Sequence, residues 1–283
     1  MSMPLTVSIQ KSNVLQTFFF GPYYIEIGTT SSTHMTTIDL KNDMSNWNAS
    51  VPKRIDASAS RLKINIPKGG YASQGGVNVK CKPDGIKKSK TFELSFKLRV
   101  PKNHDWVKGG KLGLGANING GTGGKAWEKN DGSCRLMWRR NGQLIVYLYL
   151  CEDQGTYVPE NASCPLVKNQ GDDFKEACGN KWPKAGLDVF RFTKQKLFLK
   201  KGTWNTITYG ATLNSAPDKS DGKVWVELNG ERLETGGIRF TKNVDNNQFT
   251  QIQMPTWFGG GDASWAPKKD TWFKLKDMSY TFA

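Results

Sequence analysis

The sequence predicts an all-β protein, built as an antiparallel sandwich or barrel, and three observations support this fold class. Apolar and polar residues alternate with a period of two in several segments, as in strands that bury one face. The 283 residues include 30 glycines, which suit many short strands joined by tight turns. No long stretch has the 3.6-residue period of a helix, and only residues 172–178 are expected to form one or two helical turns.

The strongest strand candidates follow one another along the chain. Residues 61–67 place three aliphatic side chains on one side, and residues 92–100 alternate five apolar residues with Glu, Ser, Lys and Arg. Residues 223–228 repeat the pattern and end in Asn229-Gly230, a pair typical of hairpin turns. Further candidates are residues 23–27, 203–209, 249–254 and 271–282.

The domain organisation follows from length and composition. Single hydrophobic cores stop growing near about 250–300 residues, so this chain suits one large domain. No composition break marks a linker, and no internal repeat is visible. We therefore expect one domain over residues 31–283, preceded by an N-terminal extension or edge strand over residues 1–30. The longest polar loops are expected at residues 28–56 and 151–184.

The chain is strongly basic, with 40 Lys and Arg against 25 Asp and Glu and a net charge of +15. Nucleic acid, an anionic membrane surface and an acidic polysaccharide are the polyanions that such a charge attracts. No nucleic-acid recognition motif is present, and no apolar stretch approaches the roughly 18 residues of a membrane span. We therefore expect neither nucleic acid nor a membrane as partner. A solvated basic face that only aids solubility remains an alternative.

The cysteines and histidines give little support to a metal site. There are five cysteines, an odd number: Cys81, Cys134, Cys151, Cys164 and Cys178. No C-x-x-C occurs and there are two histidines, so neither zinc nor another metal or cofactor is expected. One disulfide among the last three cysteines and buried free thiols both remain open. The N-terminus lacks the pattern of a secretory signal.

The glycine-rich segment 108–151 does not match a phosphate-binding loop. Gly124-Lys125 is followed by Ala126 instead of Ser or Thr, and a third glycine is missing at Ile118. No helical pattern follows either. Nucleotide binding is therefore excluded at this segment.

A hairpin within this segment can be derived from its pattern. Two alternating stretches, residues 133–139 and 144–150, flank the sequence Arg-Asn-Gly at 140–142. A two-residue turn would set Leu136 opposite Tyr147 and mix the two faces. A three-residue loop with a left-handed glycine matches apolar residues with apolar residues along the whole hairpin. Because a slip of one residue moves every side chain to the other face, burial favours the three-residue loop.

The favoured register has a chemical consequence. It sets Arg135 opposite Tyr147 and Ser133 opposite Tyr149 on the face away from the core. Lys111 is expected on the same side, because the leucines that follow it belong to the core. A cation beside a tyrosine lowers the pKa of the phenol by about 1–3 units from about 10. Such a phenolate can act as a general base without histidine or paired carboxylates, although a solvated outer face is the simpler alternative.

These residues also carry a resemblance to a known family. The chain has a Lys, a Ser-x-Arg and a Tyr-x-Tyr in the contexts KGGKLGLG, CRLMWRRNG and YLY: Lys111, Ser133, Arg135, Tyr147 and Tyr149. This spacing resembles polysaccharide lyase family 14, which contains alginate and glucuronan lyases of molluscs and chlorella viruses. The likeness covers residues 57–283 and includes later segments such as 201–230 and 258–271. Cys134, Cys151 and a long insert after Cys151 depart from the family pattern.

The resemblance implies a β-jelly roll whose concave basic sheet holds the five residues in a cleft. The implied reaction is β-elimination of a 1,4-linked uronic acid chain, which leaves 4,5-unsaturated uronate ends. Arg135 would stabilise charge on the C6 carboxylate, helped by Lys111 and Ser133. Tyr147 and Tyr149 would supply base and acid, with Tyr147 preferred as base because it faces Arg135.

The same resemblance implies two substrate-binding residues, a class of substrate and a location for the enzyme. Arg139 would hold a neighbouring uronate, and Trp257 would stack on a sugar ring or fill the core. The expected partner is an anionic polysaccharide of a cell wall, met outside the cell by a monomeric, secreted or virion-associated protein. The alternative is a non-catalytic carbohydrate-binding module or lectin. A glycosidase is disfavoured because no pair of carboxylates accompanies the hairpin.

Overall fold

The computed structural model describes residues 35–38, 48–58, 60–82, 86–121, 130–151, 187–191 and 193–283. The chain divides into two units, Met1–His34 and Met35–Ala283, and all described residues belong to the second. Several expectations lie outside the described residues: the N-terminal extension, the strand at 23–27, the helical turns at 172–178, and any disulfide that involves Cys164 or Cys178.

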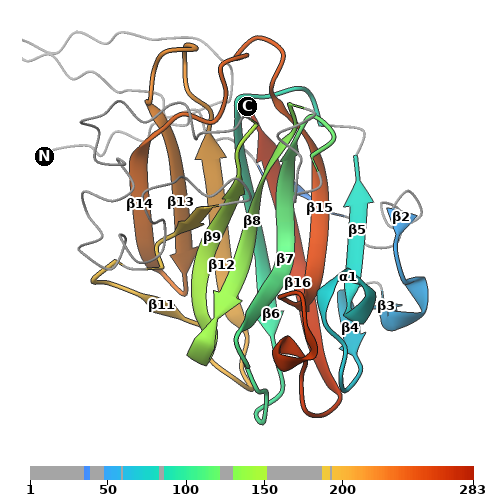
Figure 1. Ribbon diagram of the computed structural model, residues 1–283. Helices are drawn as coiled ribbons and strands as arrows, with labels where there is room; N and C mark the ends of the chain where they lie inside the picture. The colour runs from blue at the N-terminus through green and yellow to red at the C-terminus, as the bar shows by residue number, and fades with distance from the viewer. Residues whose placement is uncertain are drawn as a thin grey trace, which may run out of the picture. The chain divides into compact units, whose positions relative to one another are not determined.

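The all-β prediction is confirmed, because the described chain forms two eight-stranded sheets (Figure 1). The first sheet has the order β14-β13-β12-β6-β16-β4-β3, with β1 paired to β16. Its strands are β1 (Thr36–Thr37), β3 (Ile55–Ser58), β4 (Arg61–Ile66), β6 (Thr91–Arg99), β12 (Asn205–Thr212), β13 (Gly222–Leu228), β14 (Glu231–Ile238) and β16 (Thr271–Phe282). Its strand pairs are all antiparallel.

The second sheet has the order β10-β9-β8-β7-β15-β5-β2, with β11 paired to β9. Its strands are β2 (Asn48–Ala49), β5 (Val77–Cys81), β7 (Gly109–Ile118), β8 (Gly132–Arg139), β9 (Gln143–Tyr149), β10 (Leu187–Val189), β11 (Leu197–Phe198) and β15 (Phe249–Phe258). These pairs are antiparallel as well. The helices among the described residues are short: α1 (Ala72–Gly75) and the 3-10 turns η2 (Pro52–Arg54), η4 (Arg140–Gly142) and η6 (Ala263–Trp265). None is long and apolar enough to cross a membrane.

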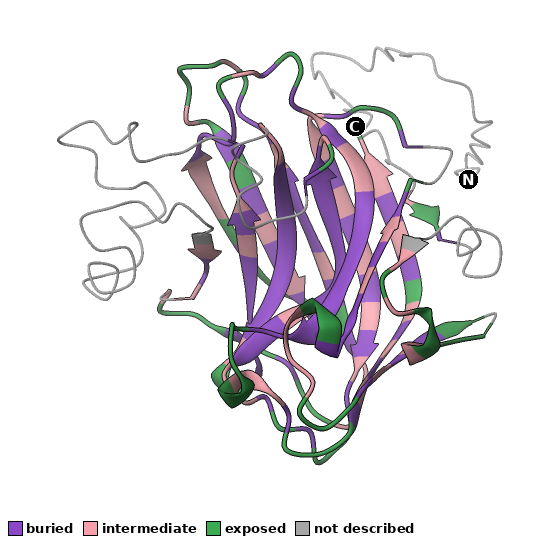
Figure 2. Cartoon of the chain, turned by 45° about the vertical axis from the view of Figure 1, so that its right-hand side comes forward, coloured by how far each residue is buried: buried purple, intermediate pink, exposed green. Residues whose placement is uncertain are grey.

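The core lies between the two sheets and is built by the alternation seen in the sequence. Strand β6 shows it clearly, since every second residue from Phe92 to Leu98 is buried while the residues between them are partly exposed. The ring of Phe92 meets the ring of Phe249 from the other sheet edge-on, with 4.6 Å between centroids. Figure 2 shows the same buried bands along the strands. One face of each sheet is therefore committed to packing, and the other is left for binding or solvent.

The hairpin of β8 and β9 adopts the predicted register. Arg135 pairs with Tyr147 and Ser133 with Tyr149, while Leu136 pairs with Val146 across the core side. The loop has three residues, and its glycine is left-handed with φ +80°. Asn141, with φ +61°, is left-handed too, which asparagine tolerates better than most residues.

Strand β7 contains an irregularity that the sequence pattern did not indicate. Leu112 pairs with Leu136, but the next paired residue is Gly115, opposite Arg135, so β7 carries two extra residues at this point. Gly113 lies in this bulge with φ +67°, and a Cβ added there would lie 2.3 Å from the Phe96 ring in the core. Only glycine fits this position. The bulge shifts the rest of β7 relative to β8, as bulges near functional sites often do.

Candidate active site

One row of side chains crosses five neighbouring strands on the outer face of the second sheet. It runs through β9, β8, β7, β15 and β5: Tyr147, Arg135, Gly115, Gln253 and Lys80. Gly115 leaves the middle of the row without a side chain. A Cβ there would lie 3.2 Å from Cγ of Gln253 and 3.5 Å from Cγ of Arg135, so these two side chains flank the glycine closely.

A second row of side chains lies beside the first and orients the guanidinium of Arg135. It contains Tyr149, Ser133, Asn117 and Gln251. Nε of Arg135 donates a hydrogen bond of 3.0 Å to Oγ of Ser133, which fixes the plane of the guanidinium. Nδ2 of Asn117 donates a 2.9 Å hydrogen bond to Oε1 of Gln251. The bulge in β7 is what aligns these rows across the sheet.

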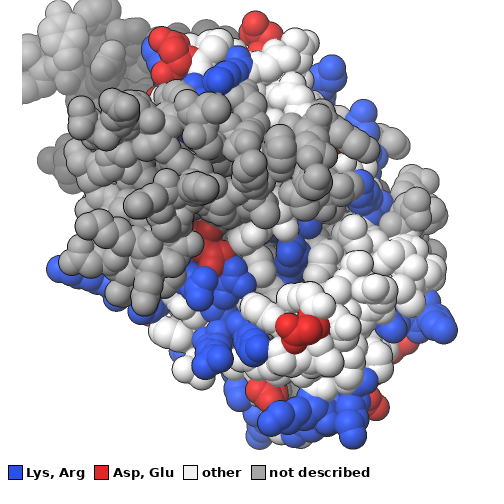
Figure 3. Space-filling model, viewed as in Figure 1, with Lys and Arg blue, Asp and Glu red and all other residues white. Residues whose placement is uncertain are grey.

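Lys111 lies at the end of the same group, beyond the bulge. Its Nζ is 5.3 Å from the ring centre of Tyr147 and 5.8 Å from that of Tyr149. It is also 5.6 Å from the ring of Trp257, its partner in register on β15. The structure therefore brings all five predicted catalytic residues together on one face. Lys and Arg side chains are visible on the same side of the molecule in Figure 3.

The two tyrosines lie in contact, but their environments push their pKa values apart. Their ring centroids are 4.9 Å apart at an interplanar angle of 72°. Burial acts to raise the pKa of Tyr149, but the charges of Lys111 and Arg135, with hydrogen bonds to Lys111 and Tyr147, outweigh it and lower that pKa. Burial, the neighbouring Tyr149 and the charge of Asp188 raise the pKa of Tyr147. Such a pair assigns one group as the better base and the other as the better acid.

Arg135 forms the floor of this group, with only 2% of its surface exposed. Burial lowers the pKa of its guanidinium to about 10, so it stays charged at neutral pH. Its Nη2 is buried without a hydrogen-bond partner among the described residues. A charged donor in that state is costly unless an acceptor reaches it, and a carboxylate is the acceptor that suits it best. Lys111 is also desolvated, and burial lowers its pKa.

The two predicted substrate-binding residues, Arg139 and Trp257, are already engaged in contacts within the protein. Nε of Arg139 donates a 3.1 Å hydrogen bond to Asp188 on β10, and its Nη2 also pairs with that carboxylate. Asp188 accepts a further 2.8 Å hydrogen bond from Arg191. Arg139 is thus already held by an aspartate, whose single charge it shares with Arg191. Trp257 is only 8% exposed, which favours packing against Lys111 over an open stacking platform.

Sequence reasoning missed Gln253, Asn117 and Lys80. Both amide atoms of Gln253 and Oδ1 of Asn117 are buried without a hydrogen-bond partner among the described residues. The alternation of residues 249–254 could have placed Gln253 on the side away from the core, but nothing in the sequence indicates which strand lies beside it. Burial lowers the pKa of Lys80, and the charge of Arg135 lowers it further.

The functional groups on this face are the cations of Lys and Arg, the phenols of Tyr, and the amides of Gln and Asn. No cluster of three or more His, Cys, Asp or Glu residues that could hold a metal occurs in the described part of the chain. Cys134 faces the core below Arg135, and burial raises the pKa of its thiol. General base, general acid and anion stabilisation are therefore available from phenols and cations. These are the groups required to remove a proton next to a carboxylate and expel an alkoxide.

The fold and this site define a β-sandwich enzyme of the polysaccharide lyase class. A family model described as Polysaccharide lyase 14 matches residues 54–278, and the chain belongs to that family. No curated protein matches the sequence significantly. The individual proteins with which this chain can be compared therefore come from solved structures.

Three solved alginate lyases are similar to this chain in fold. Alginate lyase vAL-1 from Chlorella virus has a TM-score of 0.65 at 21% identity, covering 88% of this chain and 99% of that one. The PL-14 alginate lyase from Aplysia kurodai has a TM-score of 0.62 at 20% identity, covering 83% and 90%. A mutant of alginate lyase Aly36B, in complex with an alginate trisaccharide, has a TM-score of 0.67 at 19% identity, covering 88% and 98%. These similarities confirm the antiparallel β-sandwich of jelly-roll type.

Proposed function

We propose that this polysaccharide lyase cleaves 1,4-linked polyuronates, such as glucuronan, alginate or a uronate-containing algal cell-wall polymer, by β-elimination. The cluster of Arg135, Lys111 and the two tyrosines on one face carries this proposal. The alginate bound to a relative of the same fold supports an acidic polysaccharide as substrate. We further propose that the enzyme works as a monomer outside the cell, secreted or virion-associated, on cell-wall polysaccharide.

Arg135 is the proposed stabiliser of the developing charge. Removal of the proton from C5 of the uronate moves negative charge onto the C6 carboxylate in an enolate-like state. A guanidinium there binds the transition state more strongly than the ground state, which is what accelerates the reaction. Its Nη2, which has no partner among the described residues, supplies the donor, and Ser133 holds the plane of the guanidinium through Nε.

Tyr149 is the proposed base and Tyr147 the proposed acid, which reverses our preference from the sequence. Tyr147 faces Arg135 in register, but the guanidinium carbon of Arg135 lies 5.0 Å from the ring centre of Tyr149. Tyr149 also has the lowered pKa and Tyr147 the raised one. The C5 proton passes to the Tyr149 phenolate, the C4–C5 double bond forms, and the C4–O4 bond breaks. The leaving O4 takes the proton of Tyr147.

The proposal is tested by incubating the protein with a panel of defined polyuronates and following ultraviolet absorbance of 4,5-unsaturated ends. We expect new absorbance with at least one polymer and none with a neutral polysaccharide of similar linkage. Binding of a polyuronate without any unsaturated product would instead indicate the non-catalytic carbohydrate-binding alternative. Release of reducing ends without absorbance would indicate hydrolysis and contradict β-elimination.

The net charge of +15 predicts a salt-dependent KM for the polymer. A basic face concentrates a polyuronate by long-range attraction, and this attraction weakens as the Debye length falls from about 10 Å at 0.1 M to about 3 Å at 1 M salt. We expect KM to rise steeply over this range, with a much smaller change in kcat. Initial rates at several salt concentrations measure both. A KM that stays constant would contradict the electrostatic part of the proposal.

Gln253 predicts a trade-off between stability and activity. Its amide is buried beside Arg135, has no hydrogen-bond partner in the part of the chain that the structure describes, and is in a position to bond the substrate carboxylate. In Gln253→Met we expect kcat/KM to fall about tenfold to a hundredfold, because a hydrogen bond to a charged group is lost. We expect the Tm to stay the same or rise, because a desolvated amide is removed from the folded state.

The matched control for this variant is Gln251→Met, two residues earlier on the same face of β15. Oε1 of Gln251 already accepts a hydrogen bond from Asn117. We expect this variant to lose stability, because the Asn117 amide is left without its acceptor, and to lose less activity than Gln253→Met. Equal losses of activity in both variants would contradict the role given to Gln253.

A further inference from the structure

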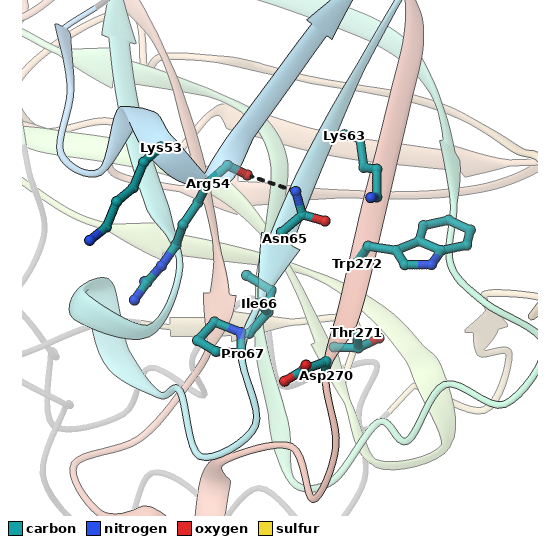
Figure 4. A pocket seen from close by; sticks show the side chains of 9 residues that line it. All are labelled: Lys53, Arg54, Lys63, Asn65, Ile66, Pro67, Asp270, Thr271 and Trp272. Carbon is teal, nitrogen blue, oxygen red and sulfur yellow. Dashed lines mark hydrogen bonds between the residues drawn. The ribbon is translucent and has the colours of Figure 1, made fainter.

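A second basic and aromatic pocket lies on the first sheet, away from the candidate active site (Figure 4). Its volume of about 490 Å³ is in the range of small-ligand sites. The η2 turn contributes Lys53 and Arg54, β4 contributes Lys63, and the start of β16 contributes Trp272. Asp270 also lines the pocket, and its Oδ1 accepts a 2.7 Å hydrogen bond from the backbone of the adjacent loop.

A row of three cations continues from this pocket across the outer face of the first sheet. Lys63 on β4 pairs in register with Lys274 on β16, and Lys274 pairs with Arg99 on β6. Like charges directly opposite each other destabilise a sheet. Partial burial and the charges of Arg61, Arg99 and Lys63 lower the pKa of Lys274.

Carboxylates only partly relieve this repulsion. Lys63 pairs with Asp56 at 3.5 Å. No described carboxylate forms an ion pair with Lys274 or Arg99, and Nε of Arg99 is buried without a hydrogen-bond partner among the described residues. A polyanion laid across β4, β16 and β6 would neutralise the row.

Two tryptophans give this surface the means to bind sugar rings. The ring centre of Trp272 is 4.5 Å from Nζ of Lys274, and that of Trp204 is 5.0 Å from Nζ of Lys276. Both indoles are partly exposed. Residues 272, 274 and 276 alternate along β16 and therefore project from the same face, about 6.6–6.8 Å apart. An apolar ring beside each cation matches the apolar face and the carboxylate of a uronate.

We propose that this outer-sheet site, defined by Lys63, Arg99, Trp272 and Lys274, binds a second stretch of acidic polysaccharide away from the point of cleavage. The inference rests on the proposed function, because it takes the same polymer as ligand. A sugar is favoured over nucleic acid because the proposed function already supplies an acidic polysaccharide as ligand, and Asp270 at the edge of the pocket can accept hydrogen bonds from sugar hydroxyl groups. Two sites on one polymer raise its apparent affinity, because the second contact is intramolecular.

The test is affinity electrophoresis through gels that contain a polyuronate, with cleavage stopped by Tyr149→Phe in every protein. We expect Trp272→Ala combined with Lys274→Gln to bind the polymer about tenfold more weakly than its parent. The matched control is Trp225→Ala with Arg232→Gln on β13 and β14 of the same sheet. That pair also has a cation over a tryptophan ring, at 5.4 Å, but Glu234 neutralises its arginine at 2.7 Å. We expect the control to migrate like its parent.

Separate measurements distinguish the failure of this inference from the failure of the proposed function. With Tyr149 restored, the double variant should cleave short oligouronates within about twofold of the wild-type rate. This activity also proves that the double variant is folded. If the double variant does not fold, the single variant Lys274→Gln replaces it in the same measurements. The outer-sheet site would be overturned if the polyuronate gel retarded the double variant as strongly as its parent. It would also be overturned if the variant lost retardation in gels with single-stranded DNA but not in gels with polyuronate. A wild-type protein that is retarded but cleaves no polyuronate would overturn the proposed function alone.

Discussion

Arg135→Ala is expected to lower kcat on a polyuronate by about 10²–10³-fold, the usual effect of removing a donor from an anion-stabilising site. The guanidinium is charged and buried, and its Nη2, to which no described residue is bonded, can donate to the C6 carboxylate. Because this charge develops in the transition state, kcat should fall more than KM rises. Initial rates of ultraviolet absorbance give both constants.

Folding must be separated from catalysis in this experiment, because Arg135 is 2% exposed and its removal leaves a cavity. The Tm of each variant reports the fold. Arg135→Lys is the matched control, since it keeps the charge but loses the planar donors and the bond to Ser133. We expect its kcat to lie between those of wild type and Arg135→Ala. A folded Arg135→Ala variant with near-normal kcat would discard the role given to Arg135.

Tyr149→Phe is expected to lower kcat by about 10²–10⁴-fold, the range for loss of a general base. The base acts as a phenolate, so activity should rise with pH until Tyr149 has ionised. That step comes below pH 10, because Lys111 and Arg135 lower the pKa of Tyr149. Tyr147 keeps its proton over the same range, because its pKa is raised. Burial also lowers the pKa of Lys111, and loss of the Lys111 proton removes one of the charges that lower the pKa of Tyr149.

The wild-type enzyme should therefore have an alkaline optimum, measured as kcat/KM against pH. Tyr147→Phe is the matched variant: it should also be slow, but it should keep the rise with pH that Tyr149→Phe loses. If Tyr149→Phe kept the wild-type profile and Tyr147→Phe lost the rise, the two roles would have to be exchanged. An optimum near pH 5 would argue for carboxylates and against a phenolate base.

The hairpin of β8 and β9 shows how far a local pattern can reach. Alternation and one Arg-Asn-Gly loop were enough to predict that Arg135 lies opposite Tyr147. This succeeded because a wrong register would have exposed an entire apolar face, so burial leaves one solution. The alternation of β6 was equally informative about the core.

The neighbours of that hairpin were not predictable in the same way. Gln253 lies in the row of Arg135 only because β15 pairs with β7, more than a hundred residues earlier in the chain. Asp188, which pairs with Arg139, comes from another distant strand. Of the two roles considered for Trp257, stacking on a sugar ring and filling the core, its burial favours the second, which the sequence could not decide. Sequence alternation tells which face a residue occupies, but not which strand is beside it.

The sequence by itself determined that this chain is a β-sandwich, that Ser133, Arg135, Tyr147 and Tyr149 share one outer face, and that the family is polysaccharide lyase 14. Tertiary structure alone decided which tyrosine has the lower pKa, that Gln253 stands beside Arg135, and that three cations line up on the opposite sheet. The physical reason is the distance along the chain over which each interaction acts. Side-chain alternation and turn geometry act over a few residues, whereas burial, desolvation and charge–charge coupling depend on strands that only folding brings together.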